Sequence, residues 1–262
     1  MIRVRQYGSD GPLVAVLHGG PGAPGYMAPV ARRLGDAFRV VEPLQRGSGR
    51  EPLTVALHVE DLQEVLTSQC GGRRVALVGH SWGAMLALAH AARHPGQIAS
   101  IVLIGSGTFS GAARERFHAI VDSRTDVSLR RRLRTLDLEY ADPDERLAAR
   151  ARLTLPLYSY DLESADPGFE SADARAHEQT WTDMMRLQEE GVYPGAFAAI
   201  RVPVIMMHGA DDPHPGEMIR ASLEPYLPQL EYVEWQRCGH YPWLEPVRDQ
   251  FYESLLDWLQ RH

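Results

Sequence analysis

Residues 74–94 read RVALVGHSWGAMLALAHAARH, and this stretch decides the fold. Arg74–Val78 is mostly a continuous apolar run, which is typical of a strand buried on both faces. Trp82–Arg93 has the pattern of a helix. Between them, Gly79-His80-Ser81-Trp82-Gly83 is a G-x-S-x-G motif, whose small residues allow a sharp turn from strand to helix. Such a turn holds the serine oxygen clear of the sheet, beside helix N-terminal N–H groups that stabilise negative charge. The sequence therefore predicts Ser81 as a nucleophile.

Three other strand-like runs are each followed by a polar or glycine-rich loop. The run LVAVL precedes His18–Gly22 (HGGPG), VPVIMM precedes Gly209–Pro213 (GADDP), and LEYVEW precedes Gly239–Trp243 (GHYPW). Open parallel sheets place their sites at the carboxyl ends of strands. A serine, an acid and a histidine therefore follow strand ends in the chain order of a nucleophile-elbow hydrolase. Glycines in the first of these loops suit a backbone oxyanion donor.

Two alternatives arise in the same loops. His208, Asp211, Asp212 and His214 have the spacing of a metal cluster, but a strand end separates the two histidines and no other His-rich motif accompanies them. Cys238 lies two residues before His240, but it has no base of its own in the right order, so a buried apolar role is expected. We therefore predict neither a metal site nor a cysteine nucleophile.

The pattern of the whole chain predicts an α/β fold with a mostly parallel, doubly wound sheet. Short apolar runs alternate with helical stretches in residues 1–108 and again in 200–262. Residues 109–199 contain no strand-like run and read as helices broken at prolines. A helical segment of this length between two strands is an insertion over the sheet, not a loop. We expect a core of residues 1–108 and 200–262 and a helical cap of residues 109–199.

Composition excludes several functions. The chain has 262 residues and a net charge of −7, which disfavours general binding to nucleic acid or anionic membranes. It contains no lysine and no asparagine, which excludes lysine-dependent cofactor chemistry and N-glycosylation. The two cysteines form no disulfide framework. The chain shows no secretory leader and no apolar run long enough to span a bilayer, so a cytoplasmic location is expected.

The motifs resemble those of the α/β-hydrolase superfamily and, within it, the prolyl aminopeptidase (proline iminopeptidase) branch. The resemblance spans both ends of the core but not the cap. HGGPG, QRGSG and S-W-G are fairly specific to that branch, whereas the acid and histidine motifs belong to the whole superfamily. The matching stretches are His18–Gly22 (HGGPG), Gln45–Arg50 (QRGSGR), Gly79–Ala84 (GHSWGA), His208–Pro213 (HGADDP) and Gly239–Pro246 (GHYPWLEP).

The resemblance implies roles for individual residues. Ser81 matches the nucleophile and His240 the base. Asp212 matches the acid by the family's G-x-x-D spacing from Gly209, with Asp211 as the alternative. The implied oxyanion donors are the N–H groups of Gly20 and Trp82. In the cap, the candidates for substrate binding are Glu178, Trp181 and Asp183.

The chain also departs from the branch pattern. Leu44 stands where the branch has an aspartate, Glu51 where it has a serine, and Pro213 where some members have an acid that helps to hold the substrate's ammonium group. We therefore predict a cofactor-free serine hydrolase that cleaves a small ester or amide through an acyl-enzyme. A prolyl aminopeptidase, a lactonase or thioesterase, and a slow-turnover ligand receptor are the alternatives. The expected partner is a small molecule or short peptide.

Overall fold

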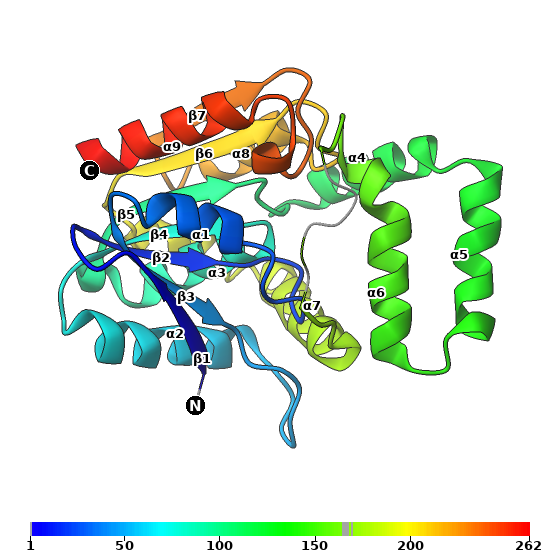
Figure 1. Ribbon diagram of the computed structural model, residues 1–262, viewed down its shortest axis with the longest axis horizontal. Coiled ribbons are helices and arrows are strands. Elements are labelled where there is room, and N and C mark those ends of the chain that lie inside the picture. Colours follow the sequence, from blue (N-terminus) through cyan, green and yellow to red (C-terminus); the bar gives the residue numbers. More distant parts are fainter. Residues whose placement is uncertain (1, 164–167, 169) are drawn as a thin grey trace.

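The computed structural model describes residues 2–163, 168 and 170–262. They form a seven-stranded sheet, which is flanked by helices (Figure 1). The strand order is β1-β3-β2-β4-β5-β6-β7, and only β1 runs antiparallel to its neighbour. The strands are β1 (Arg3–Tyr7), β2 (Leu13–Leu17), β3 (Arg39–Leu44), β4 (Val75–His80), β5 (Ile98–Ile104), β6 (Val204–Gly209) and β7 (Leu230–Trp235). The predicted mostly parallel sheet is confirmed.

Helices cover both faces of the sheet, which explains the continuous apolar runs of the central strands. Successive side chains of β2 point to opposite faces, so Leu13, Ala15 and Leu17 pack on one side and Val14 and Val16 on the other. The helices α2 (Val55–Cys70), α3 (Trp82–Arg93) and α8 (Gly216–Leu223) cover the first face. The helices α1 (Ala28–Leu34) and α9 (Arg248–Arg261) cover the second.

Strand β3 is longer than the sequence pattern indicates. The apolar residues of Phe38–Val41 are followed by a glutamate and a proline, but the strand continues to Leu44. The buried Glu42 carboxylate accepts a hydrogen bond from the Tyr7 hydroxyl at 2.9 Å, and Pro43 lies opposite Val4 in the antiparallel pair. Pairing with β1 therefore carries the strand through two residues that rarely continue one.

The segment between β5 and β6 is helical. Its helices are α4 (Gly111–Arg124), α5 (Val127–Glu139), α6 (Pro143–Thr154) and α7 (Ala174–Glu189). Their N-caps Ser110, Asp126, Asp142 and Asp173 each accept a hydrogen bond from a first-turn N–H. Pro143 begins α6 instead of breaking it, because proline is tolerated at the first helical position. Pro167, another of the prolines in this segment, lies outside the described residues.

Helices α5 and α6 lie side by side and are the part of the insertion farthest from the sheet (Figure 1). The insertion begins at the carboxyl edge of the parallel strands, where β5 ends at Ile104, and the chain then returns to the opposite edge, where β6 begins at Val204. Helices α4, α6 and α7 of the insertion stand near the carboxyl edge, where Ser81 and His240 also lie. Among the described residues, no helix is long and apolar enough to cross a membrane.

Candidate active site

Ser81 occupies a strained turn between β4 and α3. Its φ of 54° and ψ of −118° lie in a region that non-glycine residues rarely adopt. A side chain at Gly79 would overlap the carbonyl of Gly83, and one at Gly83 would overlap the carbonyl of Leu17. The two glycines of G-x-S-x-G therefore let the chain reverse tightly against β2. The turn is pinned by the Ser81 N–H, which donates to the Ile104 oxygen at 2.9 Å.

Ser81 lines a cavity of about 720 Å³ between the carboxyl edge of the sheet and the inserted helices. His240 and Gly20 line the same cavity from the loops after β7 and β2, and the wall opposite them includes residues of α4, α6 and α7. Trp82 is the first residue of α3, so its backbone N–H lies outside the intrahelical hydrogen bonds. The fold thus brings the serine, the histidine and the glycine loop together at one opening.

His240 is hydrogen-bonded to Asp212. Its Nδ1 lies 2.6 Å from the Asp212 Oδ2, and both side chains are buried. Gly105, at the end of β5, lies against this pair, where a Cβ would stand 2.9 Å from the His240 Nδ1. The alternative acid, Asp211, has no such contact: its backbone oxygen accepts from Arg124 at 2.8 Å. Of the two adjacent aspartates, only Asp212 can orient the imidazole.

The Asp212 carboxylate has further partners that keep it ionised. Its Oδ1 accepts from the backbone N–H and the Nδ1 of His214 at 2.9 and 2.8 Å, and the His208 Nε2 lies 3.5 Å from Oδ2. Burial acts to raise the pKa of Asp212, but the imidazoles of His240, His214 and His208 hold that pKa well below its usual range. A charged acceptor is therefore fixed beneath His240.

His240 is held neutral by its surroundings. Burial lowers its pKa below the ordinary value, although Asp212 acts in the opposite direction. The ring stacks on His214 at a centroid distance of 4.8 Å, and His214 stacks in turn on Phe117 of α4 at 4.5 Å. The backbone N–H of His240 also donates to the backbone oxygen of Tyr158 at 2.7 Å. A neutral imidazole with Nδ1 bonded to a carboxylate leaves Nε2 free to accept a proton.

The glycine loop after β2 carries an unbonded donor. Gly20 adopts a φ of +44°, and its N–H donates to no other described residue. The preceding Gly19 N–H donates to the Tyr26 hydroxyl oxygen at 2.7 Å. From α7, the His177 Nδ1 donates to the Pro21 oxygen at 3.0 Å. The loop is therefore held from the core and from the cap while the Gly20 N–H is left available at the cavity.

A buried hydrogen-bond chain connects three of the loops. The Tyr26 hydroxyl lies 2.6 Å from the His80 Nδ1, and the His80 Nε2 donates to the His240 oxygen at 2.8 Å. Burial holds the pKa of His80 well below its ordinary value, so this ring is neutral and bridges a donor and an acceptor. The glycine loop, the serine turn and the histidine loop are thus tied through Tyr26 and His80.

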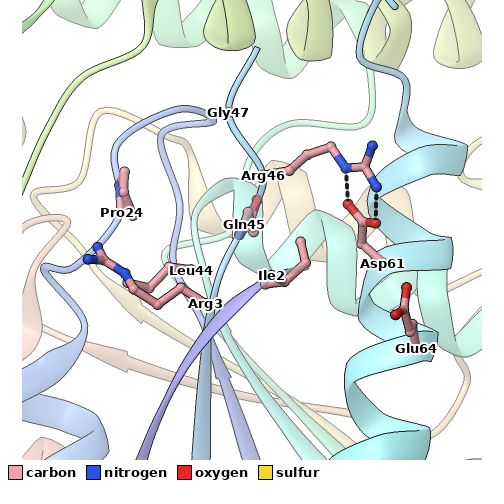
Figure 2. A pocket seen from close by; sticks show the side chains of 9 residues that line it. All are labelled: Ile2, Arg3, Pro24, Leu44, Gln45, Arg46, Gly47, Asp61 and Glu64. Carbon is pink, nitrogen blue, oxygen red and sulfur yellow. Dashed lines mark hydrogen bonds and ion pairs between the residues drawn. The ribbon is translucent and has the colours of Figure 1, made fainter. Parts of the chain in front are cut away.

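Gln45 and Arg46 of the QRGSGR motif make contacts that hold backbone segments near the site. Gln45 donates to the His18 oxygen at 2.7 Å and accepts from the Trp82 Nε1 at 2.8 Å, so it links the glycine loop to α3. Figure 2 shows the Arg46 guanidinium facing Asp61 of α2, with which it forms a bidentate ion pair. The cavity drawn there, about 490 Å³, is not lined by Ser81. This motif therefore positions backbone and does not enter the candidate active site.

The predicted substrate-binding residues of α7 lie in different environments. Trp181 lines the cavity, together with His177 and Met185, at intervals of four residues on one face of the helix. Asp183 instead accepts from the Val55 N–H at 2.8 Å and pairs with Arg186. Glu178 is exposed, and neither acid is among the described residues that line the cavity.

A metal-like cluster exists, but with other members than the sequence pattern indicates. The structure brings together donor atoms of Asp212, His214 and His240 within 4.8 Å of one another. The Nδ1 atoms of both histidines already hydrogen-bond the Asp212 carboxylate. The facing atoms of these three side chains are therefore already satisfied by hydrogen bonds to one another. Cys238 is fully buried, and burial raises its pKa, as suits a small apolar residue.

Comparison with known proteins gives the class that this fold and site define. The model of the alpha/beta hydrolase family matches residues 14–251, so the chain belongs to that family. It is 26% identical to the proline iminopeptidase of Lactobacillus crispatus (strain ST1), over 96% of this chain and 90% of the relative. It is also 26% identical to the 2-hydroxy-6-oxo-2,4-heptadienoate hydrolase of Pseudomonas putida, over 92% and 86% of the two chains. The structure of MenH from S. aureus superposes with a TM-score of 0.70 at 17% identity, over 99% of this chain and 98% of that one.

These findings confirm the predicted fold class, the predicted resemblance to proline iminopeptidases and the prediction that the chain belongs to a family of hydrolases. Sequence reasoning did not find the supporting roles of Tyr26, His80 and Gln45, nor the contact of His214 with Asp212. The last of these had a signal, because His214 lies two residues after Asp212 in a loop already singled out. The other contacts join segments far apart in the chain.

Proposed function

We propose that the protein is a serine hydrolase that cleaves a small ester or amide through an acyl-enzyme on Ser81. One observation carries this proposal. A serine in a strained strand-to-helix turn shares a cavity with a histidine whose Nδ1 is hydrogen-bonded to a buried aspartate. Serine, histidine and aspartate with these roles define nucleophilic acyl transfer.

In the proposed reaction, the Ser81 oxygen bonds to the substrate carbonyl carbon while its proton passes to the His240 Nε2. The carbonyl oxygen becomes an oxyanion that accepts hydrogen bonds from the N–H groups of Gly20 and Trp82, each typically worth about 3 kcal/mol. The same proton then leaves with the alcohol or amine. Water repeats the sequence on the acyl-enzyme, with His240 as base, and releases the acid. Asp212 stabilises the imidazolium formed in each half.

The test is covalent labelling of Ser81, whose oxygen displaces fluoride from the phosphorus of a fluorophosphonate. A fluorophosphonate is expected to label Ser81 in the wild-type chain and nothing in Ser81→Ala. That variant should lower kcat for p-nitrophenyl acetate by roughly 10⁴–10⁶ while keeping the circular dichroism of the wild type. Labelling elsewhere, or unchanged turnover in Ser81→Ala, would reject the mechanism. Absence of steady p-nitrophenyl acetate turnover in the wild-type chain would favour a slow-turnover receptor.

A second candidate is a proline iminopeptidase, which the similarity to the Lactobacillus enzyme over nearly the whole chain favours. That activity requires carboxylates to face the substrate's ammonium group, since desolvating an unpaired charge is costly. Proline p-nitroanilide is the discriminating substrate. We expect its kcat/KM to fall below that of p-nitrophenyl acetate, and the reverse order would establish the aminopeptidase.

Residues 109–199 are proposed to act as the cap that selects the substrate, with residues 1–108 and 200–262 as the catalytic core. Lactonase and thioesterase substrates would use the same machinery. A cytoplasmic location stays a prediction from the sequence.

A further inference from the structure

The cavity that contains Ser81 has an unbalanced charge. Among the described residues, its walls carry three arginines, Arg114 of α4 and Arg150 and Arg152 of α6, and one carboxylate, Glu170. This excess is local, because the chain as a whole has a net charge of −7. A positive cavity in an acidic protein attracts anionic ligands.

The single carboxylate is already neutralised from outside the cavity. Glu170 forms ion pairs with Arg3 and Arg5 of β1, neither of which lines the cavity. Asp212 lies buried beneath His240 and is paired there. In the part of the chain that the structure describes, no carboxylate in the cavity is therefore left to receive a substrate ammonium group.

The arginines, by contrast, have no acidic partner among the described residues. Arg114 is half-buried, and its Nη2 donates to the neutral Gln188 Oε1 at 2.6 Å, while Gln188 donates to the Thr108 oxygen at 3.0 Å. The Nε of Arg114 is buried without a partner. Arg150 and Arg152 are exposed at the cavity and make no ion pair with a described residue. A partly desolvated, oriented guanidinium without a counter-charge is a favourable place for an anion.

The remaining walls are mostly apolar. Phe117, Leu147, Leu155, Trp181 and Met185 line the same cavity. Such a surface suits an aliphatic or aromatic chain and gives no partner to a polar one.

We propose that the natural substrate is an acyl compound with an apolar body and a carboxylate, the carboxylate being bound by Arg114 with Arg150 and Arg152. The proposal rests on the proposed function, because it places the carbonyl of that substrate at Ser81. It also distinguishes this chain from an enzyme that selects a free N-terminal amine.

The test uses three p-nitrophenyl esters of equal chain length and different charge: the monoester of adipic acid, the ester of hexanoic acid and the ester of 6-aminohexanoic acid. We expect kcat/KM to be at least tenfold higher for the adipate ester than for the hexanoate ester, and lowest for the amine. Equal values, or an order that places the amine first, would overturn the proposal.

Arginine variants test which side chains cause the preference for the adipate ester. Arg114→Gln should lower the adipate-to-hexanoate ratio of kcat/KM at least fivefold, mainly through the KM of the adipate ester. The double variant Arg150→Gln/Arg152→Gln should lower the same ratio. The matched control is Arg116→Gln, an exposed arginine of the same helix α4 that does not line the cavity, and it should leave the ratio unchanged. A fall of equal size in this control would reject the assignment.

Binding separates this proposal from the hydrolase proposal. The monoanilides of adipic, hexanoic and 6-aminohexanoic acid can be titrated into Ser81→Ala by calorimetry, where no turnover is needed. Tightest binding of the adipate anilide supports the charge assignment even if no ester is hydrolysed. If esters are hydrolysed through Ser81 but the amine anilide binds as tightly, only the charge assignment fails.

Discussion

Asp211 and Asp212 are neighbours in the chain, yet only one of their carboxylates meets the His240 imidazole. Asp212→Asn should therefore lower kcat for p-nitrophenyl acetate by about 10⁴, because a neutral amide favours the wrong imidazole tautomer and removes the charge that stabilises the imidazolium. Steady-state kinetics at pH 7 measure the effect.

The neighbouring residue supplies the control. Asp211→Asn should change kcat less than threefold, since the Asp211 contacts with Arg124 and Cys238 are made by backbone atoms. A larger loss in Asp211→Asn than in Asp212→Asn would show that the acid is assigned one residue too far along the loop.

At this scale, the sequence could indicate which residues lie at strand ends but not what surrounds them. Ser81, Asp212 and His240 each follow a strand whose apolar run is visible in the sequence. The bridge from Tyr26 to His80 joins positions 54 residues apart and leaves no local pattern. The face of α7 that borders the cavity leaves no clear signal either, because it lies beside the helix's buried stripe and carries both the polar His177 and the apolar Trp181 and Met185.

The turn between β4 and α3 depends on close contact with β2, and this gives a prediction about the elements. In Gly83→Ala, the added methyl group would overlap the backbone carbonyl of Leu17, which neither rotation nor repacking of a side chain relieves. The free energy of unfolding, measured by urea denaturation, should fall by more than about 2 kcal/mol. Turnover should fall as well, because the shift reaches Ser81.

The matched control for that variant is Gly96→Ala in the short turn before β5. No atom lies within 4 Å of a Cβ built at Gly96, and its φ is not in the left-handed region. The free energy of unfolding should change by no more than about 0.5 kcal/mol. If both variants are equally stable, the elbow is not as tightly packed as the structure indicates.

Elements with one uniform environment were the most predictable. Leu13–Leu17 (LVAVL) and Leu230–Trp235 (LEYVEW) have in the structure the bounds that their sequence runs indicate, and the first is continuously apolar because it is buried throughout. The end of β3 was missed because pairing with β1 overrides the local signal of Glu42 and Pro43. The packing of α5 against α6 was not readable either, since most of their residues are exposed or half-buried.

The whole molecule buries several neutral histidines, which couples its stability to pH. Burial lowers the pKa of His18 and of His58 to about 4 and that of His90 to about 3. In the unfolded chain these groups regain a pKa near 6.5. Between those values the unfolded state binds more protons than the folded state, so the free energy of unfolding rises with pH there. The contribution of these neutral histidines to the free energy of unfolding is fully present above about pH 6.5 and is lost as the pH falls toward 4.

Urea denaturation between pH 7 and pH 4.5 should therefore show a steady fall in the free energy of unfolding, by roughly 1.4 kcal/mol per pH unit for each such histidine. Glu42 and Glu245 act in the opposite sense, because burial raises their pKa values and the folded state then takes up the proton first. A comparison of two variants isolates the effect of one histidine. Below pH 6, His90→Gln should lower the number of protons taken up on unfolding by about one, so the free energy of unfolding depends less steeply on pH. The exposed His118→Gln should leave this dependence unchanged. A wild-type stability that is constant from pH 7 to pH 4.5, or an equal effect of both variants, would mean that the buried imidazoles gain protons without unfolding the chain.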